Sequence, residues 1–259
     1  MGVLAAALDR LTRELERVAA HSGEDAVHDV RVAVRRAAEA LRLTGQDMPK
    51  ARRLRRELRT VRRDAAAVRD RDVARRLLRR LGLPAADPAL IYLAGQRDCA
   101  ASQLRGDLSR LLQKDRPARW RKWSDHAREP VADLPVAIAK FFEAGREAAA
   151  SGEPGELHQL RIAAKRLRYT IEILDPEGGE APLAGLRALQ RQLGAMQDAI
   201  AAESLLGQLP KLSSSARRVA GELQRRSRDY AGAASRAWPR RFGPRVEKAW
   251  LDWAAGEKS

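Results

Sequence analysis

Apolar residues recur at intervals of three and four along most of this 259-residue chain. The first series is Leu4, Leu8, Leu11, Leu15 and Val18, and it predicts an amphipathic helix over residues 4–20 because this spacing places side chains on one face. Further helices are predicted over residues 23–45, 52–82, 87–114, 131–150, 154–174, 183–209, 212–237 and 239–255. No alternating run of β-branched residues stands out. We therefore expect an all-α fold.

Two helix ends have specific signals. Ser22 is followed by Asp25 three residues later, which predicts a capping box at the start of the second helix. Pro239 is expected to open the last helix, because proline suits a first helical position and interrupts a helix interior. Trp238, Trp250 and Trp253 are the large apolar residues nearby, so we expect them to anchor the C-terminal packing.

One basic helix pattern occurs twice, in residues 27–41 and 157–174, at a constant offset. The matching pairs are His28 with His158, Arg31 with Arg161, Arg35 with Lys165, and Arg36 with Arg166. The match continues into the next helix of each half, where Asp70 corresponds to Asp198. The repeat predicts two helical bundles related by an approximate internal two-fold, with the Pro- and Trp-containing segment 116–130 between them.

Helical geometry places the cations of the second copy beside its apolar stripe. At about 100° per residue from His158, Arg161 falls near 300°, Lys165 near 340° and Arg168 near 280°, whereas the apolar residues fall between about 180° and 260°. A basic row at this border suits the wall of a groove better than the back of a solvated helix. Ordinary surface arginines are the alternative, and the repetition of the pattern argues against it.

The charge balance narrows the class of partner. The net charge is +16, 44% of the residues are apolar and only 4% are aromatic. This balance favours a folded helical protein that binds a polyanion such as nucleic acid, an anionic membrane or a phosphate polymer. Cys99 is the only cysteine, which fits a reducing compartment. No signal peptide or membrane span is evident, so we expect a cytoplasmic protein that does not enter a membrane.

These helices resemble a known family. HDVRVAVRRAAEAL and LHQLRIAAKRLRYTIEIL are similar to the two signature helices of the CHAD family, the conserved histidine α-helical domain, and VRDRDV and LGAMQD are similar to motifs on the helices that follow. The resemblance implies one CHAD domain over residues 1–259, built of two pseudo-symmetric antiparallel four-helix bundles. Its N-terminal half is expected over 1–116 and its C-terminal half over 131–259. It also implies a shared central groove that binds inorganic polyphosphate.

The repeat and the resemblance together select the candidate contacts. For polyphosphate these are His28, Arg31, Arg35, Arg36, Arg62, Arg69, His158, Arg161, Lys165, Arg166, Arg168 and Tyr169, with Arg55 and Arg59 as secondary candidates. Arginine suits this ligand because its fork donates two hydrogen bonds to a phosphate and keeps its charge. The first copy has Ala38 where the second has Arg168, so one phosphate contact fewer is expected there.

Alternatives to a binding module for polyphosphate stay open at this point. A nucleic-acid-binding helical protein is compatible with the charge, but nucleic acid is expected to bind only non-specifically because Tyr169 is the only aromatic residue in the basic helices. A phosphotransferase or polyphosphate hydrolase would use His28 or His158 as phosphate acceptor. Either histidine could instead be structural and bond a carboxylate such as Asp70 or Asp198.

We expect no enzyme activity, cofactor or metal, because no phosphate-loop, nucleophile-elbow or HExxH motif is present. The sequence leaves open the oligomeric state and an association with polyphosphate granules.

Overall fold

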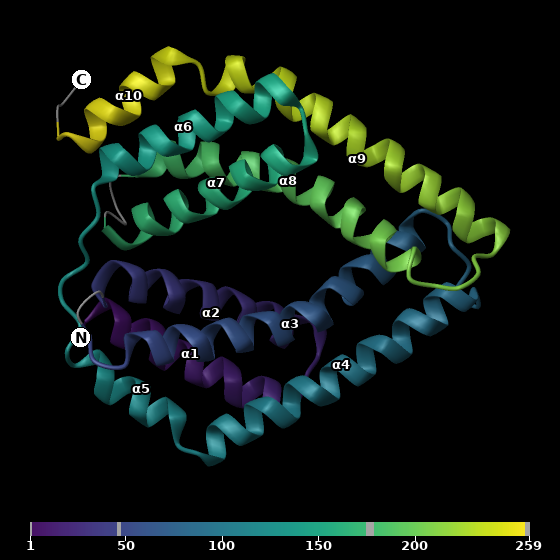
Figure 1. The fold of residues 1–259 in the computed structure, drawn as a ribbon, viewed down its shortest axis with the longest axis horizontal. Coiled ribbons are helices and arrows are strands. Elements are labelled where there is room, and N and C mark those ends of the chain that lie inside the picture. Colours follow the sequence, from purple (N-terminus) through teal and green to yellow (C-terminus); the bar gives the residue numbers. More distant parts are fainter. Residues whose placement is uncertain (1, 46–47, 175–178, 257–259) are drawn as a thin grey trace. The chain divides into compact units, whose positions relative to one another are not determined.

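The computed structural model describes residues 2–45, 48–174 and 179–256. Within these ranges it contains ten helices and no strand (Figure 1). The helices are α1 (Val3–Ala20), α2 (Glu24–Thr44), α3 (Ala51–Arg80), α4 (Pro88–Gln113), α5 (Arg116–Ser124), α6 (Leu134–Ser151), α7 (Pro154–Leu174), α8 (Glu180–Leu206), α9 (Ser214–Arg241) and α10 (Pro244–Ala254). The predicted all-α fold is confirmed. No described helix combines the length and apolar character needed to cross a membrane.

The chain forms two compact units. Unit 1 comprises residues 1–131 and 204–219, and unit 2 comprises residues 132–203 and 220–259. Unit 1 thus takes in α5, the end of α8, the start of α9 and the turn between these two helices, beyond the predicted half 1–116. Ser213 in that turn explains part of this: its hydroxyl donates to Asp87 Oδ2 over 2.6 Å and accepts from the amide of Ala216 over 2.9 Å.

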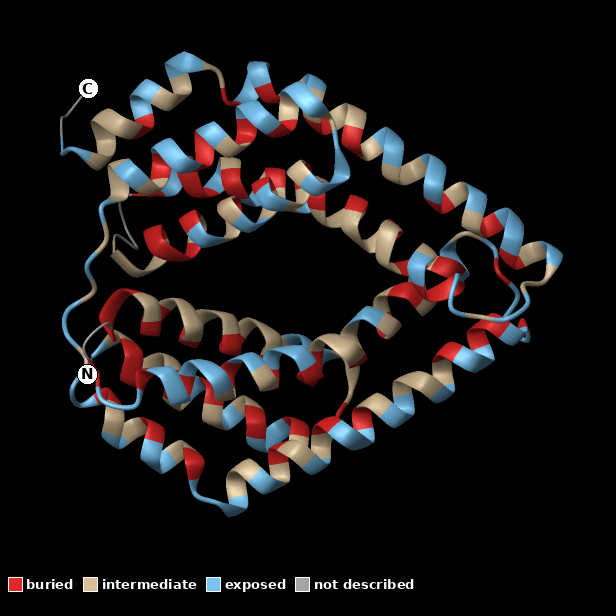
Figure 2. Ribbon diagram, viewed as in Figure 1, coloured by how far each residue is buried: buried red, intermediate tan, exposed pale blue. Residues whose placement is uncertain are grey.

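The core of unit 1 lies among α1, α2, α3 and α4. α1 packs against α2 and α4, and α3 packs against α2 and α4. The apolar positions that predicted these helices, such as Leu11, Leu15 and Leu54, are fully buried, and buried positions recur along one side of each helix (Figure 2). Glu57 of α3 holds the short α5 against this bundle, because it accepts hydrogen bonds from Arg116 (2.5 Å) and from the indole of Trp120 (2.6 Å).

Unit 2 is centred on an aromatic cluster. Phe141 and Phe142 of α6 contact Trp238 of α9, Phe242 directly after α9, and Trp250 of α10, mostly edge to face, with ring centroids 4.8–6.3 Å apart. Such pairs contribute about 0.5–1.5 kcal/mol beyond area burial. Trp238 and Trp250 are therefore the anchors that the sequence predicts, whereas Trp253 is only partly buried at the edge.

The expected helix break at Pro239 is wrong. α9 continues through Pro239 to Arg241, and a new helix begins only at Pro244. Proline removes one helical hydrogen bond and normally costs about 3 kcal/mol in a helix interior. Here Trp238 and Phe242, on either side of it, are both buried in the aromatic cluster, and the amide of Phe242 still donates to the carbonyl of Trp238 over 2.8 Å. Tertiary packing therefore outweighs the local preference.

The predicted capping box at Ser22 is also wrong. Gly23 is the N-cap of α2, and no side chain caps it. Ser22 is buried, its hydroxyl accepts a hydrogen bond from Arg105 of α4 over 2.6 Å, and its carbonyl accepts one from Arg97 over 2.6 Å. The Ser22 hydroxyl oxygen therefore bonds Arg105 of α4 and does not cap α2.

Candidate functional site

The first basic face lies on α2, in unit 1. Val27, Val30 and Val34 form the fully buried stripe of this helix, and Arg31 lies beside them with only 15% of its side chain exposed. Its guanidinium is 3.7 Å from Asp70 of α3. Arg35, one turn further on, is half-buried on the same side. The expected basic row at the border of the apolar stripe is therefore present.

His28 and Arg36 take different positions on α2. His28 is exposed. Arg36 lies about 140° around the helix from Arg31, on the side where Asp29 accepts a hydrogen bond from Arg17 of α1. That bond raises the pKa of Arg17 above its usual value. The structure therefore does not bring Arg36 into one row with Arg31.

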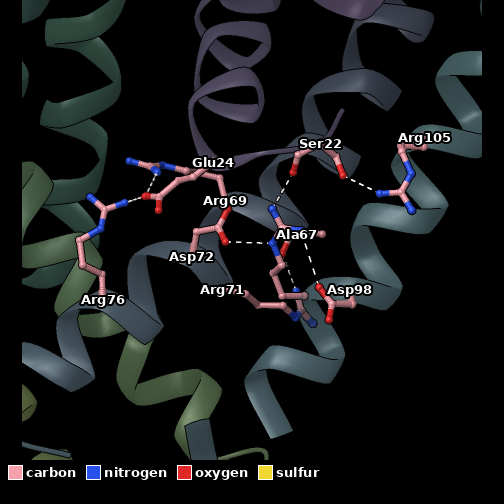
Figure 3. A network of polar contacts seen from close by, with 10 residues as sticks. Ser22, Glu24, Ala67, Arg69, Arg71, Asp72, Arg76, Asp98 and Arg105 are labelled. Atoms are coloured by element: carbon pink, nitrogen blue, oxygen red, sulfur yellow. Dashed lines mark hydrogen bonds and ion pairs between the residues drawn. The ribbon is translucent and has the colours of Figure 1, made fainter. Parts of the chain in front are cut away.

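The α3 candidates divide in two. Arg55, Arg59 and Arg62 are exposed. Arg69 instead donates to Glu24 in the first turn of α2 over 2.7 Å, with 18% of its side chain exposed, and Arg76 pairs with the same carboxylate (Figure 3). Arg69 thus fixes the start of α2 and has less capacity left for a ligand.

A second ion pair extends this network from α3 to α4. Asp72 is buried and accepts a hydrogen bond from Arg97 over 3.0 Å, and the same guanidinium donates to the carbonyl of Ser22 (Figure 3). Removing one partner of such a buried pair costs far more than an exposed pair contributes. Asp72 and Arg97 therefore position the beginning of the helix that carries His28 and Arg31.

The second basic face lies on α7, in unit 2. Leu157, Leu160, Ala164, Leu167 and Ile171 form its buried stripe. The half-buried candidates beside it are His158, Arg161 and Lys165, whereas Arg166 is exposed. His158 Nδ1 lies 3.0 Å from Gln197 Oε1 of α8, the residue before Asp198, so an amide holds this ring where the sequence suggested a carboxylate.

The C-terminal part of the α7 face contains the only aromatic candidate. Arg168 lies over the ring of Tyr169 at 4.5 Å from its centroid, and its guanidinium donates to Glu172 over 3.2 Å. Tyr169 is only 6% exposed. A ring buried beneath an arginine offers no free face on which a base could stack.

Several positioning residues were not predicted. Gln190 of α8 donates to the carbonyl of Ala164 over 2.9 Å, and together with Gln197 it fixes α7 against α8. Glu24 and Glu172 hold Arg69 and Arg168 respectively. Single polar residues carry no periodic signal, and only the LGAMQD motif pointed to the neighbourhood of Gln197. The described residues bring no three His, Cys, Asp or Glu side chains together as metal ligands.

The fold and the two basic faces define the class of protein: the described part is a helical domain with half-buried cations along α2 and α7. The CHAD domain family model matches residues 2–207, more than half of the chain, and the chain therefore belongs to the CHAD family, which is associated with inorganic polyphosphate. The sequence-based resemblance is confirmed.

Two solved structures share the fold. PptA from Streptomyces chartreusis is 19% identical, with a TM-score of 0.64 over 93% of this chain and 96% of that one. The CHAD domain from the plant Ricinus communis is 21% identical, with a TM-score of 0.60 over 99% of this chain and 90% of that one. At these sequence identities the similarity to the two structures shows a shared fold and no more. No curated protein matches the chain in sequence.

Proposed function

We propose that this protein binds inorganic polyphosphate, without converting it, on the basic faces of α2 and α7. The observation that carries the proposal is the setting of the cations, which stand half-buried at the border of a packed apolar stripe on both helices. Arginines held in this way have lost part of their conformational freedom before binding, so a linear polyanion orders fewer side chains. The predicted groove shared by the two halves stays a prediction.

The aromatic content favours inorganic polyphosphate over nucleic acid. Polyphosphate presents a regular series of anionic oxygens and no bases, so cations alone suffice to bind it. Single-stranded nucleic acid is usually bound by aromatic residues as well as by charge. The single aromatic of the two faces, Tyr169, is buried under Arg168.

The positions of the histidines favour binding over phosphoryl transfer. His158 is held by the amide of Gln197, and His28 is exposed. Phosphoryl transfer generally needs carboxylates that hold Mg²⁺ next to the phosphates. Of the acids nearest the basic faces, Asp70 pairs with Arg31 and Glu172 with Arg168. We place the binding in the cytoplasm, with polyphosphate granules as one site of action.

A competition experiment tests this proposal. A fluorescent single-stranded RNA is bound to the protein, and long-chain polyphosphate or unlabelled RNA is added at equal phosphate concentration. We expect polyphosphate to displace the probe at a much lower concentration than RNA does. Equal or better competition by RNA would favour the nucleic-acid function instead. Phosphate release from the same polyphosphate in the presence of Mg²⁺ is measured in parallel, and sustained release would show that the protein is an enzyme.

A further inference from the structure

Unit 1 contains a hollow lined by cations, on the side of α3 that meets α4. The cleft between these helices has a volume of about 520 Å³. Arg53 and Arg56 of α3 line one wall, and Arg110 of α4 and Lys114, directly after α4, line the other. None of these residues belongs to the basic face of α2, and cations on two facing walls can contact an anion from both sides.

The acids in this cleft already have partners. Glu57 accepts from Arg116 and Trp120 of α5 and lies 3.3 Å from Arg53, and Asp107 accepts from Arg110. Four cations therefore face two carboxylates that are both engaged. Arg56 and Lys114 are exposed, and neither forms an ion pair with any residue in the described part of the chain. The cleft keeps an excess of positive charge for a ligand.

This cleft is continuous with the candidate cations on α3. A neighbouring hollow of about 640 Å³ at the start of α3 shares Arg53 and Arg56 with the cleft and also includes Lys50 and Arg55. Arg55 precedes Arg59 and Arg62 by four and seven residues, so the three lie on one face of the helix. Cations thus continue from that face, around the start of α3, into the cleft.

We propose that the start of α3 and the α3–α4 cleft form a second binding segment for inorganic polyphosphate, which extends the contacts of a long chain beyond Arg55. This proposal rests on the proposed function. No aromatic residue lines either hollow, so a base would find no stacking platform there, whereas a phosphate chain needs only charge and hydrogen-bond donors. Short chains end before the cleft, and long chains reach it.

Chemical footprinting of lysines tests the segment directly. Lys50 and Lys114 line it, Lys165 lies on the α7 face, and Lys122 lies outside both. The protein is acetylated briefly with and without long-chain polyphosphate, and modification is read by mass spectrometry. We expect polyphosphate to protect Lys50, Lys114 and Lys165 several-fold and to leave Lys122 unchanged. Protection of Lys165 alone would overturn the second segment and leave the proposed function intact, whereas no binding and no protection anywhere would overturn both.

A charge-matched pair of variants provides the second test. Arg56→Gln with Lys114→Gln removes two exposed cations of the cleft, and Arg80→Gln with Lys122→Gln removes the same two residue types elsewhere in unit 1. We expect the first variant to weaken binding of long-chain polyphosphate about tenfold at low salt, with tripolyphosphate binding unchanged. Equal losses in the two variants would mean that only net charge matters, which contradicts a defined segment. Protection of Lys50 and Lys114 by RNA as strong as that by polyphosphate would contradict the choice of ligand.

Discussion

The α2 and α7 faces carry the same sequence pattern, but the structure completes them differently. The α7 face ends in Arg168, which covers Tyr169 and pairs with Glu172. At the equivalent positions α2 has Ala38, Glu39 and Arg42, and Arg42 donates to Glu39 over 2.6 Å. The cations of the α7 face therefore continue to Arg168, whereas α2 has Ala38 at the equivalent position and the carboxylate of Glu39 next to it. The same sequence pattern thus gives different surfaces on α2 and α7, because the residues that follow the pattern determine how far the row of cations continues.

The largest expected effect concerns the position that both faces share. Arg31→Ala and Arg161→Ala should each weaken binding of long-chain polyphosphate by about 1.5–3 kcal/mol, because each removes a charge-assisted hydrogen-bond donor. Isothermal titration calorimetry measures the loss, with the exposed Arg13→Ala as the control that should change little. If only one of the two substitutions matters, only one face belongs to the site.

The cores of the two units should respond differently to added volume. A Cβ on Gly145 of α6 would clash with the ring of Trp238, so Gly145→Ala should destabilise the protein by about 1–3 kcal/mol. A Cβ on Gly106 of α4 would meet no neighbouring side chain or other helix within 4 Å in the described part of the chain, and Gly106→Ala should stabilise the protein by about 0.5–1 kcal/mol. Urea unfolding measures both. A neutral Gly145→Ala would mean that the aromatic cluster is loosely packed.

Substitutions at the equivalent positions 38 and 168 test the difference between the C-terminal parts of the α2 and α7 faces. Arg168→Ala should weaken polyphosphate binding by about 1.5 kcal/mol, and Ala38→Arg should strengthen it by a smaller amount because Glu39 lies beside the new side chain. The slope of log affinity against log salt should fall by about one in the first variant and rise by up to one in the second. Unchanged slopes in both variants would show that position 38 and Arg168 do not contact the ligand.

The smallest expected difference lies between the histidines. His158→Ala removes the contact with Gln197 and should cost about 0.5–1.5 kcal/mol of the free energy of unfolding. His28 is exposed, so His28→Ala should leave that free energy nearly unchanged. Thermal unfolding compares the two variants, and equal destabilisation would show that the histidines occupy equivalent environments.

The helices could be predicted from the sequence because several apolar residues in each of them repeat the same spacing. The spacing of Leu and Val located the helices, and the repeat singled out Arg31 and Arg161, which are both half-buried in the structure. The errors came from residues whose local preference lost to a distant partner: Ser22 bonds Arg105 of α4, and Pro239 lies between two aromatic anchors. The pairing of Arg69 with Glu24 was not predicted for a related reason, since nothing in a row of arginines shows which one meets a carboxylate.

One measurement tests the central claim most directly. Binding of long-chain polyphosphate to the wild-type protein and to the Arg31→Ala/Arg161→Ala double variant is measured at several salt concentrations between about 50 and 200 mM. We predict that wild-type affinity falls steeply with salt, by about 10³-fold over this range if six or more cations contact the chain, and that the double variant binds at least 100-fold more weakly with a shallower slope. Wild-type affinity and slope in the folded double variant would contradict binding at these two faces.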